Sequence, residues 1–169
     1  MKILLHMSVS ADGFIARLDG DSDWVSQIDS DLFLKRVSEA RCLIMGRRTF
    51  EQFQGSLYPV KDVCNIVLSS KSKSKNREGN AFFVSSPTEA VGLAKEKGYK
   101  EVLLAGGGHT NGSFLNAGLI DEIFLSVHPL ILNDGMRLFE GNEKDAKIEL
   151  VDTRKMGDGL VELHYKVIS

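Results

Sequence analysis

Residues 41–51 read RCLIMGRRTFE, and residues 101–108 read EVLLAGGG. Each stretch begins with a short apolar run that predicts a buried strand, and each then passes through glycine into a segment predicted to be helical. Because the carboxyl ends of parallel strands meet at one edge of a sheet, the two glycine turns are expected to lie close together. The repeated strand–glycine–helix pattern indicates an α/β protein.

Apolar runs and turn signals divide the rest of the chain in the same way. The expected strands span residues 2–9, 41–45, 62–68, 81–84, 101–105 and 121–132, and the expected helices span residues 31–40, 47–53, 86–97 and 111–117. Ser30 or Asp29 is the expected cap of the first helix, and Pro129 is expected to bend the last of these strands or to place it at an edge.

Residues 147–156 and 160–168 alternate in polarity on either side of a Gly-Asp-Gly turn. This pattern predicts an antiparallel hairpin at the end of the chain. Together with the preceding elements, it predicts a single domain over residues 1–169. Its central sheet is expected to be mostly parallel, with helices on both faces and the hairpin at one edge.

The composition excludes several classes of protein. The chain has 169 residues, of which 43% are hydrophobic and 26% charged, and its formal net charge is -2. This mixture excludes a fibre or a wholly disordered chain, and the charge argues against a protein that covers nucleic-acid phosphates. No stretch approaches the roughly 18 apolar residues of a membrane span.

Cys42 and Cys64 lie in apolar runs without a secretory signal, so reduced thiols and a cytoplasmic location are expected. The four histidines lack metal-ligand spacing, so no metal site is expected.

Three strand ends carry residues suited to phosphate. Gly46-Arg47-Arg48-Thr49 and Gly106-Gly107-Gly108 each open a helix, and Leu68-Ser69-Ser70 leads into a basic run at residues 71–77. Glycine lets backbone N–H groups approach a phosphate, and a helix N-terminus adds positive potential. Two such turns and a third basic segment indicate a dinucleotide with an extra phosphate, NADPH rather than NADH. The alternative is that the glycines form plain turns and the basic run is a solvated loop.

The order of these motifs resembles the dihydrofolate reductase-like superfamily. The resemblance is carried by SADGFIA at 10–16, MGRRTFE at 45–51, LSS at 68–70 and GGG at 106–108. With GDSDWVS at 20–26 and FLNAGLIDE at 114–122, the chain is most similar to the reductase (C-terminal) domain of the bifunctional riboflavin-biosynthesis deaminase–reductase. The resemblance implies a dihydrofolate reductase-like three-layer fold and hydride transfer from NADPH.

The resemblance also implies roles for individual residues. Ala11, Ile15 and Ala16 would line the nicotinamide end of the cofactor. The remaining cofactor-binding residues would hold the phosphates and the adenosine: Gly46, Arg47, Arg48, Thr49, Leu68, Ser69, Ser70, Lys71, Gly106, Gly107 and Gly108.

Catalytic and substrate-binding residues are expected in the first part of the chain. Dihydrofolate reductases use a carboxylate in the first helix. Ser30 stands at that position here, so the flanking Asp29 and Asp31 are candidates, as is Asp12. A helix-start aspartate also serves as a cap or a dipole partner. Trp24, Phe33 and Leu34 are expected to contact a planar heterocycle, although a single tryptophan also serves as a packing anchor.

The sequence leaves the substrate open. The leading interpretation is a pyrimidine reductase of the riboflavin type. Ala105 replaces a glutamate that such enzymes carry, and the GRRTFE turn is closer to folate enzymes, so a folate or pterin reductase is the alternative. A non-catalytic nucleotide-binding protein is a third reading. Nucleic-acid binding through residues 71–77 is disfavoured because no aromatic residues are interleaved. A homodimer is expected, with the apolar strand at residues 123–132 as a candidate contact.

Overall fold

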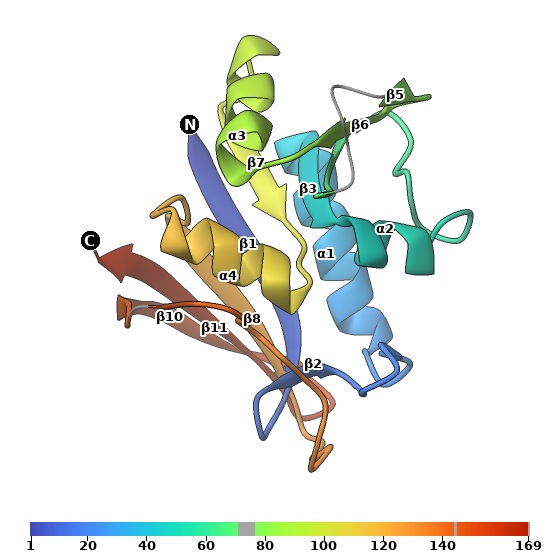
Figure 1. The fold of residues 1–169 in the computed structure, drawn as a ribbon. Coiled ribbons are helices and arrows are strands. Elements are labelled where there is room, and N and C mark those ends of the chain that lie inside the picture. The colour runs from blue at the N-terminus through green and yellow to red at the C-terminus, as the bar shows by residue number, and fades with distance from the viewer. Residues whose placement is uncertain (71–76, 144, 169) are drawn as a thin grey trace.

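The computed structural model describes residues 1–70, 77–143 and 145–168, with only the backbone of residues 77 and 78. Within these residues, nine strands form one sheet in the order β10-β11-β8-β1-β7-β3-β4-β6-β5 (Figure 1). The strands of this sheet are β1 (Lys2–Ser10), β3 (Cys42–Gly46), β4 (Cys64–Leu68), β5 (Arg77–Glu78), β6 (Ala81–Val84), β7 (Glu101–Leu104), β8 (Glu122–His128), β10 (Lys147–Gly157) and β11 (Leu160–Ile168). The helices are α1 (Gln27–Ala40), α2 (Arg47–Gln52), α3 (Pro87–Glu96) and α4 (Gly108–Asn116).

The centre of the sheet is parallel, as predicted. Strand β1 pairs in parallel with β7 and β8, and β3 pairs in parallel with β4 and β7. The terminal hairpin of β10 and β11 is antiparallel and joins the sheet through β8. Two short strands that the sequence did not reveal, β2 (Phe14–Ala16) and β9 (Met136–Arg137), form a separate antiparallel pair.

Helices cover both faces of the sheet, which gives the three expected layers (Figure 1). On one face, Ala90 and Ala94 of α3 and Phe114 of α4 pack against alternate residues of the central strands. On the other face, Val37 of α1 and Phe50 of α2 pack against the intervening residues. The continuous apolar runs of the sequence are therefore strands buried from both sides.

Several boundaries differ from the predicted ones. Helix α1 begins four residues earlier than expected, and its cap is Ser26, whose Oγ accepts a hydrogen bond from the Asp29 N–H. The strand expected at residues 121–132 ends at His128, directly before Pro129, which cannot donate to a neighbouring strand. Helix α4 begins at Gly108, three residues earlier than expected.

Strand β8 lies between β11 and β1, so both its edges are hydrogen-bonded within the chain. A second copy therefore cannot pair with this strand, contrary to one expectation for the dimer. Among the helices of the described residues, none is both long enough and apolar enough to cross a membrane.

Candidate functional site

The predicted glycine turns meet at the carboxyl edge of the sheet. Gly46, the last residue of β3, is in register with Leu68, the last residue of β4. The Gly46 N–H also donates to the carbonyl oxygen of Gly106 over 2.7 Å. The structure thus brings together all three strand ends that the sequence assigned to phosphate binding.

Two helices begin at these turns without a side-chain cap. Gly46 is the N-cap of α2 and Gly107 is the N-cap of α4, and neither offers a side chain to the first-turn N–H groups. A Cβ on Gly46 would overlap Thr110 Oγ1, so the close approach of the two turns requires glycine there. A Cβ on Gly107 would lie 3.4 Å from Thr49 Oγ1, which places this hydroxyl beside the second turn. N–H groups without a side-chain cap and a nearby hydroxyl are suitable donors for an anionic phosphate.

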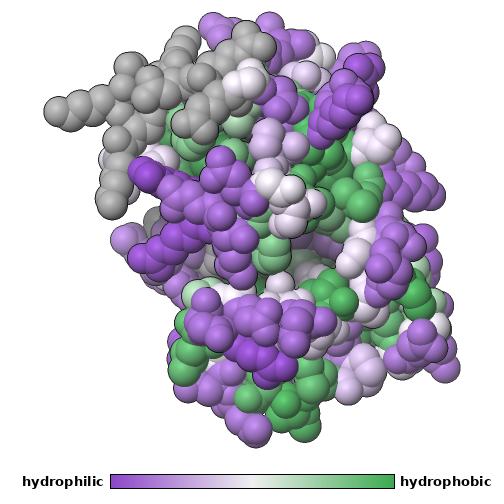
Figure 2. Space-filling model, turned by 90° about the vertical axis from the view of Figure 1, so that its right-hand side faces the viewer, coloured by the Kyte–Doolittle hydropathy of each residue, from purple (hydrophilic) through white to green (hydrophobic). Residues whose placement is uncertain are grey.

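A cavity of about 460 Å³ opens beside these turns. Figure 2 shows the side of the molecule on which α2 lies, and this side is hollowed near its centre. The lining residues come from β1, β2, α1, α2 and the turns: His6, Met7, Ser8, Ile15, Ala16, Gly20, Ser22, Asp23, Val25, Asp29, Ser30, Phe33, Leu34, Thr49, Gln52, Phe53, Leu57, Tyr58, Ala105, Gly107 and Met136.

Seven of the predicted site residues take part in this lining. They are Ile15, Ala16, Asp29, Phe33, Leu34, Thr49 and Gly107. Cofactor candidates and substrate candidates therefore share one cavity, as a transfer reaction between two bound molecules requires.

The carboxylate of Asp12 lies outside this lining and anchors a loop. It accepts hydrogen bonds from the Ser10 hydroxyl and from the N–H groups of Leu132 and Asn133, at 2.6, 3.1 and 2.8 Å. The hydrogen bond from Ser10 is the main cause that holds the pKa of Asp12 below its usual value. Asp31 is exposed on α1 and accepts a hydrogen bond from Gln27 over 2.7 Å. Catalytic roles for these two aspartates stay predictions.

Trp24 is not among the residues that line the cavity, although its neighbours Asp23 and Val25 are. Its ring meets that of His128 edge-on, with 5.1 Å between the centroids, and its Nε1 is buried without a hydrogen-bond partner among the described residues. A substrate contact by this ring stays a prediction.

The other cofactor candidates differ in exposure and in their contacts. Arg47 and Arg48 are exposed, and Arg47 pairs with Glu51 on the same helix. Gly108 is buried against Arg137 and Glu140. Ser69 is buried and Ser70 is exposed. Ala11 is exposed and its N–H donates to the Leu130 carbonyl oxygen. Lys71 lies outside the described residues, so its proposed contact with a phosphate stays a prediction.

Asp29 is fully buried at the wall of the cavity. His6 Nε2 lies 3.1 Å from its Oδ1, and the Ser8 hydroxyl donates to its Oδ2. Burial opposes ionisation, but the polar groups around the carboxylate, of which His6 has the largest effect, outweigh it and hold the pKa of Asp29 below its usual value. His6 and Ser8 were not among the site residues predicted from the sequence. They are polar and stand two positions apart in a largely apolar strand, which places both side chains on one face of the sheet.

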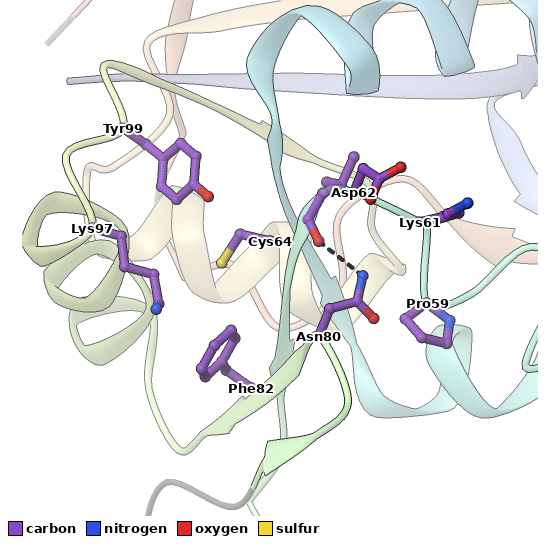
Figure 3. A pocket seen from close by; sticks show the side chains of 9 residues that line it. Pro59, Lys61, Asp62, Cys64, Asn80, Phe82, Lys97 and Tyr99 are labelled. Carbon is purple, nitrogen blue, oxygen red and sulfur yellow. Dashed lines mark hydrogen bonds between the residues drawn. The ribbon is translucent and has the colours of Figure 1, made fainter.

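A second pocket, of about 550 Å³, lies at the opposite ends of the strands (Figure 3). Cys64, Lys97 and Tyr99 point toward its interior, and Phe82 forms another part of its wall. The hydrogen bond from the Cys42 thiol, together with the charge of Lys97, holds the pKa of Cys64 below its usual value. None of the predicted site residues lines this pocket, so it is separate from the candidate site.

Known proteins match the chain along its whole length. The model of the RibD C-terminal domain family matches residues 1–162. The uncharacterized protein YyaP of Bacillus subtilis (strain 168) is 30% identical over 178 residues, which cover 97% of this chain and 94% of YyaP.

Solved structures show the same fold. A Shewanella sp. PV-4 protein provisionally assigned to riboflavin biosynthesis is 25% identical, with a TM-score of 0.81 over 100% of both chains. A Thermotoga maritima diaminohydroxyphosphoribosylaminopyrimidine deaminase/5-amino-6-(5-phosphoribosylamino)uracil reductase is 18% identical, with a TM-score of 0.74 over 99% of this chain and 56% of that chain. The expected dihydrofolate reductase-like fold is therefore confirmed. The chain belongs to the RibD C-terminal domain family.

Proposed function

We propose that this protein is an NADPH-dependent reductase that transfers a hydride to a pyrimidine-type substrate, such as 5-amino-6-(5-phosphoribosylamino)uracil. The observation that carries the proposal is the pair of uncapped helix N-termini, at Gly46 and Gly107, beside a cavity with a buried carboxylate in its wall. Family membership and the reaction attributed to the Thermotoga maritima protein support the same assignment.

The residues present suit a dinucleotide. The backbone of Gly46 and Gly106–107 and the Thr49 hydroxyl would hold its phosphates, while Ile15 and Ala16 would contact the nicotinamide from the cavity wall. NADPH supplies the hydride when it is bound. The protein supplies orientation: the apolar side chains of Phe33 and Leu34 limit the positions that a planar ring can take in the cavity.

Binding of the cofactor is tested by titrating NADPH and NADH while following nicotinamide fluorescence. We expect NADPH to bind and NADH to bind more weakly. Thr49→Val should raise the Kd for NADPH about tenfold, because a hydrogen bond to a charged phosphate contributes about 1.5 kcal/mol. Thr153→Val, on the exposed strand β10, is the matched control and should leave the Kd unchanged. A preference for NADH, or binding of neither, would refute the proposal.

The reaction is tested by stopped-flow oxidation of bound NADPH with a panel of ribosylaminopyrimidines and pterins. Fast oxidation by a ribosylaminopyrimidine supports the proposal. Oxidation by dihydrofolate or another pterin alone would support the second candidate, a folate or pterin reductase, which is favoured by the buried carboxylate of Asp29 on the first helix. Tight NADPH binding without any oxidation would indicate a non-catalytic nucleotide-binding protein.

A further inference from the structure

A chain of hydrogen bonds beside the cavity begins at Arg36, and the donor and the acceptor of each bond are fixed by chemistry. Arg36 Nη1 lies 2.7 Å from His6 Nδ1. A guanidinium only donates hydrogen bonds, so His6 Nδ1 must accept and carries no proton. The proton of the imidazole is therefore on Nε2, which lies 3.1 Å from Asp29 Oδ1. His6 donates to Asp29 as a neutral ring.

Arg36 is held in place from its other side. Its Nη1 is 2.6 Å from Glu162 Oε2, and its guanidinium lies over the ring of Phe124, 4.0 Å from the centroid. Glu162 is 1% exposed and forms a second ion pair, of 3.0 Å, with Arg154 on β10. Arg154 also pairs with Asp152 at 3.4 Å, and the buried Glu162 lies between two arginines.

His128 is the remaining titratable group near Asp29 among the described residues, with its Nε2 3.8 Å from Asp29 Oδ2. The backbone N–H of Ser26 donates to this Nε2 over 3.1 Å, and Nδ1 lies 3.0 Å from the carbonyl oxygen of Ser126. His128 therefore carries its proton on Nδ1 and has no hydrogen to donate to Asp29.

Ser8 lines the cavity together with His6 and Asp29, and it is the least buried of the three. Its hydroxyl donates to Asp29 Oδ2, whereas Asp29 is 0% exposed. A hydroxyl has one hydrogen, and Asp29 takes it, so Ser8 Oγ can only accept a hydrogen bond from a bound molecule.

We infer that Ser8 Oγ accepts a hydrogen bond from a ring N–H group of the substrate. Asp29, His6, Arg36 and Glu162 are positioning residues that keep the hydrogen of this hydroxyl directed at Asp29. This inference rests on the proposed function and names the feature of the pyrimidine that the site selects. A uracil-type ring with free N–H groups can donate to Ser8 Oγ. An N-alkylated ring cannot, and it leaves the lone pairs of Ser8 Oγ without a donor.

The direction of the chain is tested without any ligand, by ¹⁵N NMR of histidine-labelled protein. We expect His6 to carry its proton on Nε2 and His128 to carry its proton on Nδ1. The double variant Arg36→Met/Glu162→Gln removes both charges of the Arg36–Glu162 ion pair. In this variant His6 should no longer be restricted to a proton on Nε2, while His128 should keep its proton on Nδ1. If the double variant does not fold, the wild-type spectrum still decides: a protonated Nδ1 on His6 would overturn the inference.

The specificity of Ser8 is tested by calorimetry with two probes, 5,6-diaminouracil and 5,6-diamino-1,3-dimethyluracil, on protein saturated with NADP⁺. The wild type should bind the first probe about tenfold more tightly, which corresponds to the contribution of one hydrogen bond. Ser8→Ala should abolish this preference and leave the Kd for NADP⁺ unchanged. Ser38→Ala, on the exposed face of the same helix as Asp29, is the control and should retain the preference for the first probe.

The outcomes separate this inference from the proposed function. Failure of the wild type to bind NADP⁺ refutes the proposed function, whatever the histidine spectra show. If NADP⁺ binds but neither pyrimidine does, the substrate class is wrong and the inference is wrong with it. If both probes bind and Ser8→Ala keeps the preference, only the assignment to Ser8 is overturned.

Discussion

At the scale of single residues, Asp29 combines complete burial with a pKa below the ordinary aspartate value. A group of this kind stabilises the fold while it is ionised, and this contribution is complete above the ordinary pKa of 3.8. It is lost as the pH falls from that value through the lower pKa of the folded state. The geometry that orients Ser8 thus also makes the fold depend on pH.

Asp29→Asn is expected to lower the free energy of unfolding by about 3 kcal/mol at pH 7, because it weakens the buried hydrogen bonds that the carboxylate accepts from His6 and Ser8. The difference from the wild type should shrink as the pH falls below about 4, where the wild type loses the same contribution. Urea unfolding at pH 7, 5 and 3 measures both effects. Asp31→Asn, on the exposed side of the helix, should change the free energy by less than about 0.5 kcal/mol at each pH. A difference that stays constant with pH would contradict this explanation.

The sequence predicted Asp29 as a candidate but could not predict its surroundings. His6 and Ser8 come from β1, Arg36 from α1 and His128 from β8, and no local pattern links residues so far apart. Asp12 lies in the SADGFIA motif at residues 10–16, and its hydrogen bonds to the loop at Leu132 and Asn133 could not be predicted from that motif. Motifs identify which residue types are present, whereas burial and partners depend on the assembled sheet.

At the scale of elements, the glycine-marked strand ends were predicted well because they follow from local rules. A short apolar run, a glycine and a helix start are all readable from neighbouring residues. The start of α1 was not predicted correctly, because Ser26, Ser30 and Asp29 are all good caps and the sequence does not rank them. The short pair β2 and β9 has two or three residues per strand, too few for a periodic pattern.

Two helical glycines should respond oppositely to alanine. A Cβ on Gly112 of α4 would overlap the carbonyl oxygen of Glu140, so Gly112→Ala must displace a backbone segment and is expected to cost about 2 kcal/mol. A Cβ on Gly92, inside α3, meets nothing within 4 Å, so Gly92→Ala should add about 0.5–1 kcal/mol through its higher helix propensity. Chemical denaturation of both variants measures the two changes, and a stabilised Gly112→Ala would contradict the packing argument.

At the scale of the whole molecule, the two edges of the sheet differ. The β5 edge is two residues long, whereas the β10 edge has 11 residues and pairs on one side only, with β11. Ile148, Leu150 and Val151 of this strand are about half exposed, at 44%, 53% and 55%. A long edge strand with several exposed apolar side chains favours association, although β10 also carries charged residues. The sequence predicted a dimer with residues 123–132 as a candidate contact. The sheet order shows that β8 is internal, so this strand cannot contribute a free edge, and its packing against a second copy stays a prediction.

We therefore predict that two copies associate through β10. Sedimentation equilibrium should give twice the chain mass of 18.7 kDa at micromolar concentration. Leu150→Lys should shift the equilibrium to the monomer, because a charge at the contact is costly to bury. Leu18→Lys replaces a leucine that is also exposed, at 67%, but lies outside β10, in the loop before α1, and should leave the dimer intact. Because Arg154 of β10 pairs with Glu162, and Glu162 with Arg36, association at this edge would also hold the outer end of the chain that orients Ser8. A wild type that sediments at 18.7 kDa at every concentration would exclude this arrangement.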